Sequence, residues 1–72
     1  MRLSTLDCRS IVREGGSLIL DVTNYSALDL RNIAKDASGS ATLLLKNANK
    51  LSVSDIRKIA RDGNGAVTFE VL

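Results

Sequence analysis

The chain has 72 residues, with ten lysines and arginines, eight aspartates and glutamates and no histidine, which gives a net charge of +2. A chain of this length buries one core and not two, so we expect a single domain over residues 1–72. Apolar residues make up 44% of the sequence and charged residues 25%, the proportions of a globular protein. No apolar run approaches the roughly 20 residues of a membrane-spanning helix, and the first residues lack the apolar stretch of a signal peptide. We therefore expect a cytoplasmic protein with no membrane partner.

One cysteine and no histidine limit the chemistry that the chain can perform. Cys8 has no second thiol with which to form an internal disulfide or a thiolate cluster, and histidine-based triads and the usual zinc sites are excluded. We expect no cofactor and no metal. Leu30 and Ile56 occupy the positions that match Cys8 in the alignment below, which predicts a buried, unreactive cysteine.

The chain repeats itself three times. Residues 4–14 align without gaps with residues 26–36 and 52–62, and glycines follow each segment. An apolar run then closes each unit, at 18–22, 41–45 and 67–72. The repeats span approximately residues 3–24, 25–50 and 51–72, and the extra length of the second is expected as a surface insertion at Ala48, Asn49 and Lys50.

Each aligned segment begins with the signals of a helix N-terminus. A serine opens each one with an aspartate three residues later, so the serine is placed to cap the helix and the aspartate lies at its positive end. An apolar residue precedes each cap, and the glycines after each segment are expected to end the helix in a left-handed conformation. The predicted caps are Ser4, Ser26 and Ser52.

The apolar runs predict strands that alternate between two faces. One face is apolar throughout and is expected to lie against the helices. The other face is too polar to lie beneath a second layer of helices. We therefore predict an α/β fold in which three short helix–strand repeats form a parallel sheet with helices on one face only, as a small two-layer stack or mini-solenoid. The residues expected on the open face are Ile19, Asp21, Thr42, Leu44, Thr68 and Glu70.

Charged residues recur on two flanks of each predicted helix. When equivalent helices lie side by side, the basic flank of one meets the acidic flank of the next, which predicts ion pairs between units. The alternative is a basic stripe that binds nucleic acid or another polyanion, although a net charge of +2 gives little counterion release and few aromatic rings are present to stack on bases. The basic flank consists of Arg9, Arg13, Arg31, Lys35, Arg57 and Arg61, and the acidic flank of Asp7, Glu14, Asp29, Asp36, Asp55 and Asp62.

The second unit resembles a known repeat family. Residues 33–35 followed by Leu43, Leu44, Leu45, Lys46 and Asn47 are similar to the helix–strand unit of leucine-rich repeats of the ribonuclease-inhibitor type, in unit length and in the asparagine after the strand. This resemblance implies a binding scaffold with no chemistry of its own.

We therefore expect a non-enzymatic protein–protein interaction or self-assembly module, as a homodimer or small oligomer or bound to another protein. Weak polyanion binding through the basic flank is the alternative. A distant third is an acid–base or metal site at Asp21 and Glu70 on the open face, where the second unit carries Leu44 and not an acid at the matching position. The residues expected to make contacts at the third strand and on the open face are Ile19, Leu44, Phe69, Val71 and Leu72.

Overall fold

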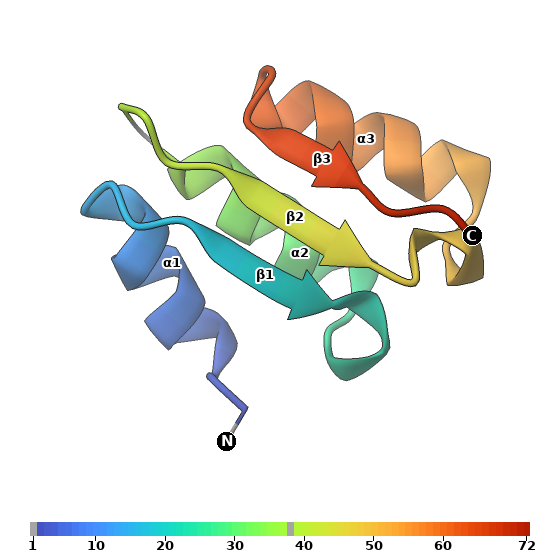
Figure 1. Ribbon diagram of the computed structural model, residues 1–72, viewed down its shortest axis with the longest axis horizontal. Coiled ribbons are helices and arrows are strands. Elements are labelled where there is room, and N and C mark those ends of the chain that lie inside the picture. Colours follow the sequence, from blue (N-terminus) through green and yellow to red (C-terminus); the bar gives the residue numbers. More distant parts are fainter. Residues whose placement is uncertain (1, 38) are drawn as a thin grey trace.

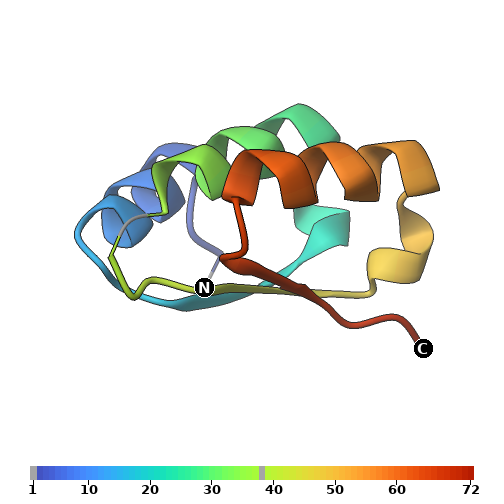
Figure 2. The same ribbon diagram turned by 90° about the horizontal axis from the view of Figure 1, so that it is seen from above.

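The computed structural model describes residues 2–37 and 39–72, in which helices and strands alternate along the chain. All the helices lie on one side of a three-stranded parallel sheet, as Figures 1 and 2 show from two directions. The predicted α/β fold with helices on one face is confirmed. The elements are α1 (Thr5–Arg13), β1 (Leu18–Asp21), η1 (Val22–Asn24), α2 (Ala27–Asp36), β2 (Leu43–Lys46), η2 (Ala48–Lys50), α3 (Val53–Gly63) and β3 (Val67–Phe69), where η1 and η2 are 3₁₀ helices.

The strands lie in chain order, β1-β2-β3, so α2 and α3 each cross over between neighbouring strands, while α1 precedes β1. Leu43 pairs with Leu18 on one side and with Val67 on the other. Alignment of the apolar runs had instead placed Ala41 opposite Leu18, two residues too early. Because side chains alternate with a period of two, this even shift leaves the predicted faces of the strands unchanged.

The helices begin where the serine caps predict. Ser4, Ser26 and Ser52 each accept a hydrogen bond from the backbone N–H three residues later, at 3.1, 3.0 and 3.1 Å. The apolar residues before the caps are partly buried against the core, as a hydrophobic staple requires: Leu3, Tyr25 and Leu51.

The helix ends agree with the prediction in part. Gly15 follows the cap of α1 with φ of 94°, as predicted, and Gly65 follows α3 with φ of 91°. In contrast, α2 ends at Ala37 in an extended conformation, and Gly39, with φ of 61°, lies two residues further on. Gly63, however, is the buried last residue of α3, and the left-handed cap is Asn64 with φ of 48°. A Cβ at Gly63 would overlap the Val67 side chain, so glycine is required there for close packing of α3 on β3.

The core is centred on the middle unit. Leu30 and Ile33 of α2 and Leu43 and Leu45 of β2 have no exposed surface, because each is covered by elements on both sides. The predicted surface insertion at residues 48–50 is wrong for Ala48, whereas Asn49 and Lys50 are exposed as expected. Ala48 is fully buried, and its N–H donates to the Glu70 carbonyl at 3.0 Å, so η2 ties the end of β2 to the chain after β3.

We predict that Gly63→Ala destabilises the protein by about 1 kcal/mol. Overlap with Val67 costs about 1–3 kcal/mol, which exceeds the roughly 1 kcal/mol that alanine gains over glycine inside a helix. Urea unfolding monitored by circular dichroism measures the difference. Ser54→Ala, at an exposed site in the same helix, is the matched control and should be neutral or stabilising. Stabilisation by Gly63→Ala would contradict the packing account.

Candidate interaction surfaces

Ion pairs join neighbouring helices in the way the charge pattern predicts. Arg9 and Arg13 of α1 both reach Asp36 at the end of α2, with Nε–Oδ2 and Nη2–Oδ2 distances of 2.5 and 3.0 Å. Arg31 of α2 repeats this contact with Asp62 of α3, with an Nε–Oδ2 distance of 2.7 Å. Three of the six residues in the predicted polyanion stripe therefore already have carboxylate partners.

The paired carboxylates are held in their charged form. The hydrogen bond from Arg9 lowers the pKa of Asp36 below its ordinary value of 3.8, and Arg13 adds to this effect against the opposing effect of burial. The hydrogen bond from Arg31 lowers the pKa of Asp62 in the same way, with smaller contributions from the charges of Lys35 and Arg61. The Nε–Oδ2 contact is thus common to both helix pairs, whereas Lys35, at the position of Arg13, acts on Asp62 through its charge and not through a hydrogen bond.

The basic flank of α3 remains open. Arg57 and Arg61 are exposed and form no ion pair within the described residues. Together with Ser54 and Lys58 they line a shallow hollow of about 140 Å³. Sequence comparison missed Lys58, because the matching positions hold Ser10 and Asn32 and the third segment alone places a cation there.

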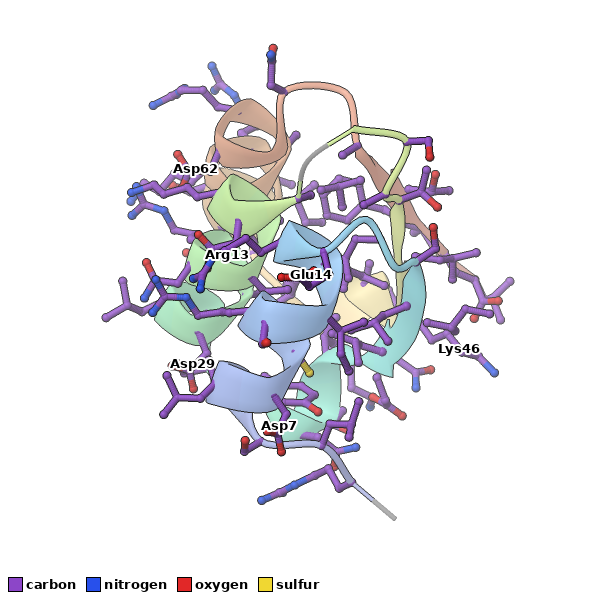
Figure 3. The ribbon with its side chains drawn as sticks, turned by 90° about the vertical axis from the view of Figure 1, so that its left-hand side faces the viewer. Asp7, Arg13, Glu14, Asp29, Lys46 and Asp62 are labelled. Atoms are coloured by element: carbon purple, nitrogen blue, oxygen red, sulfur yellow. The ribbon has the colours of Figure 1, made fainter. Side chains whose placement is uncertain are left out.

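An acidic flank remains open at the other side of the molecule. Asp7 on α1 and Glu14 at the C-terminal cap of α1 are exposed, and Figure 3 shows them on the side of the molecule opposite α3. Neither forms an ion pair with any residue in the described parts of the chain. The helix layer is therefore basic at its α3 side and acidic at its α1 side.

The open face of the sheet carries a polar network around Asp21. One carboxylate oxygen of Asp21 accepts hydrogen bonds from the N–H and hydroxyl of Thr23 at 2.9 and 2.7 Å, and the other accepts from the Asn47 side chain at 2.9 Å. The Thr23 bonds are the main reason why the pKa of Asp21 is lowered, and the charge of Lys46 contributes. These bonds make Asp21 the cap of η1 and link the ends of β1 and β2.

Asp21 and Glu70 are not brought together as an acid pair. The register places Lys46, not Leu44, beside Asp21, and continuing the register of β3 by one residue puts Glu70 on the other side of Lys46. Two strand spacings separate the acids, about 10 Å. Lys46 projects from the sheet on the side away from the helices (Figure 3).

The apolar residues expected to make contacts have different surroundings. Ile19 is exposed and Leu44 half-buried on the open face, so these two are placed on one surface. Phe69 packs partly against the core, whereas Val71 and Leu72 lie beyond the end of β3 and are exposed. The five residues therefore do not form one continuous apolar surface at a single sheet edge.

A cavity of about 350 Å³ lies beside β1, between the strand and the segment that precedes α1. Leu3, Ile19 and Tyr25 contribute to its lining. The Tyr25 hydroxyl donates to the Leu3 carbonyl at 2.6 Å and accepts from the Cys8 thiol at 3.6 Å. Burial and the Cys8 bond raise the pKa of Tyr25 to about 12. Cys8 itself is fully buried, as predicted.

Comparison of the chain with protein-family models, curated proteins and solved structures found no match. The likeness to leucine-rich repeats thus stays a resemblance in unit order and length. In residues 2–37 and 39–72, no helix is both long and apolar enough to cross a membrane. The same residues contain no cluster of three or more side chains suited to metal binding.

We predict that Asp36→Asn lowers the free energy of unfolding by about 1 kcal/mol at neutral pH, because two arginines lose their charged partner. The folded-state pKa of Asp36 is depressed, so its contribution is complete above 3.8 and is lost as the pH falls through the folded value. The difference between wild type and variant should therefore shrink below about pH 4.

Glu14→Gln is the matched control, since Glu14 occupies the corresponding position on α1 without an ion pair. Its effect should stay within about 0.5 kcal/mol in urea unfolding at low protein concentration. Equal effects of the two substitutions would contradict the assignment of Asp36 as the shared partner of Arg9 and Arg13.

Proposed function

We propose that this chain is a non-enzymatic interaction module of the cytoplasm that associates with further copies of itself. The observation that carries the proposal is that the sheet has two free edges. Within the described residues, β1 pairs only with β2, and β3 pairs only with β2 (Figure 1). A strand edge of this kind offers unpaired N–H and C=O groups to another strand.

The hydrogen bonds of β3 identify which groups are available. The Ala66 carbonyl accepts from Leu43, and the Glu70 N–H donates to Leu45, so Ala66 and Glu70 face β2. Backbone groups of successive residues in a parallel strand point to alternate sides. The N–H group of Phe69, the last residue of β3, therefore points outward at the free edge.

Exposed apolar side chains lie beside this edge. Val71 and Leu72 lie two and three residues after the end of β3 and are 61% and 91% exposed, while Ile19 is exposed on β1 at the opposite edge. Their burial against another copy would add apolar contact to a small core that contains few aromatic residues. Backbone pairing and apolar burial thus support the same kind of contact.

The surroundings of Asp21 support a function without catalysis. Its carboxylate oxygens accept hydrogen bonds from Thr23 and Asn47. Glu70 lies about 10 Å away, because β2 with Lys46 runs between the two acids. Neither acid is positioned to exchange a proton with the other. We therefore propose no enzymatic activity.

Polyanion binding is the second candidate, and one observation favours it. Arg57, Lys58 and Arg61 line the hollow on α3 and form no ion pair within the described residues. Binding of a phosphate-rich polymer there would weaken steeply as salt rises, whereas association through apolar edges would persist or strengthen. Salt dependence therefore separates the two candidates.

We predict that wild-type chain forms dimers or larger species whose mass, measured by light scattering after size exclusion, rises with protein concentration and persists at high salt. Val71→Lys should weaken this association about tenfold or more, because it places a charge beside the free edge of β3.

Leu28→Lys is the matched control. Leu28 on α2 is 63% exposed, nearly the same as Val71, but it lies on the helix layer away from both sheet edges. Its mass profile should equal that of wild type. A wild-type chain that is monomeric at every concentration would contradict the proposal, and equal weakening by both substitutions would contradict the role of the edge.

A further inference from the structure

The contact between neighbouring helices is built twice from the same positions. Arg9 and Arg13 of α1 contact Asp36 of α2, and Arg31 of α2 contacts Asp62 of α3. In the sequence alignment, Arg57 and Arg61 of α3 match the two arginines of α1, and Glu14 of α1 matches the two paired aspartates. The outer helix α3 therefore carries the arginines of such a contact without the acid, and α1 carries the acid without the arginines.

Burial along α3 shows the same incomplete contact. Val12 and Ala34 are buried because the next helix covers them, but Ala60 at the matching position of α3 is exposed. Likewise Ile56 is only half-buried, whereas both of its counterparts, Cys8 and Leu30, are fully buried. An apolar strip with arginines beside it is thus uncovered on the outer side of α3.

The outer side of α1 carries the other half of this inter-helix contact. Ile33 and Ile59 are fully buried, whereas Ile11 at the matching position is half-exposed. Glu14 is exposed, whereas the side chains of Asp36 and Asp62 are 18% and 12% exposed beneath their arginines. This flank lacks the preceding helix that covers its counterparts.

The sheet edges follow the same order as the helix flanks. The step that relates α1 and β1 to α2 and β2 also relates α2 and β2 to α3 and β3, in helix packing and in parallel strand pairing. If the same rotation and translation are applied once more, α1 and β1 of another copy lie against α3 and β3. Both layers would be extended by one movement, as Figures 1 and 2 allow the reader to follow.

We propose that copies of this chain associate head to tail. Arg57, Ala60 and Arg61 of one copy contact Ile11 and Glu14 of the next, and β3 pairs in parallel with β1. This inference rests on the proposed self-association and assigns its geometry. The contact is heterologous, because different surfaces meet, so it generates an open chain or a closed ring instead of a twofold dimer.

Charge complementarity favours this geometry over a twofold one. A twofold pairing of β3 edges brings two copies of α3 together, and with them two sets of Arg57, Lys58 and Arg61. Like charges in such an interface oppose association, whereas the head-to-tail contact places Glu14 between two arginines. The second copy therefore supplies the carboxylate that the basic flank of α3 lacks.

Reciprocal charge reversal tests the proposal. One variant carries Arg57→Glu and Arg61→Glu, and the other carries Glu14→Arg. The substituted residues form no ion pair within the described chain, so circular dichroism should show both variants folded. Each variant alone should associate at least about tenfold more weakly than wild type, because like charges now face each other. An equimolar mixture should recover the wild-type mass, since each variant complements the other.

The outcomes separate this inference from the function on which it rests. Monomeric wild-type chain would contradict both. Wild-type association that neither variant weakens would leave self-association standing and overturn the head-to-tail geometry. Weakening by both variants without recovery in the mixture would also overturn it, because the residues would then not be partners of one another.

Discussion

Each helix–strand unit of this chain is too small to bury its own apolar residues, so those residues are covered only where a neighbouring unit packs against them. The middle unit has neighbours on both sides, and Leu30, Ile33, Leu43 and Leu45 are fully buried in consequence. The outer units have one neighbour each, so Ile11, which matches Ile33, is only half-buried, and Ala60, which matches the buried Ala34, is exposed. Architectures built in this way depend on contacts between adjacent units.

Electrostatics follows the same dependence on neighbours. Asp36 and Asp62 lie within reach of arginines on the preceding helix, which lowers the pKa of each carboxyl. Exposed ion pairs contribute little to the free energy of unfolding. Their main effect here is to favour the packing of a basic helix flank against an acidic one. A basic flank on α3 and an acidic flank on α1 extend that selectivity to the outside of the molecule.

Local signals in the sequence were sufficient to predict much of the fold. The serine caps predict where the helices begin, because the hydrogen bond that each serine hydroxyl accepts from the N–H of the third helical residue involves neighbouring residues only. The ion pairs were also predictable, since the alignment places Arg9, Arg31 and their acidic partners on facing flanks.

Features that depend on distant parts of the chain were not predictable in this way. The register of β1 and β2 is two residues from that of the aligned apolar runs, which placed Leu44 in the position that Lys46 occupies. Ala48 resembles an insertion in the sequence but is fully buried, and its N–H donates to the Glu70 carbonyl in the chain after β3. The exposure of Ala60 has no signal in its own segment, because Ala34 shares its local pattern and differs only in having a neighbour.

Hydrogen exchange at the two free sheet edges tests most directly whether contacts between units continue between copies. The Leu18 N–H donates to the Thr42 carbonyl, so alternation places the Ile19 N–H at the outer edge of β1, as it places the Phe69 N–H at the outer edge of β3. Head-to-tail association predicts that both amides become protected together as protein concentration rises. Protection of Phe69 without Ile19, or of neither amide, would contradict the account.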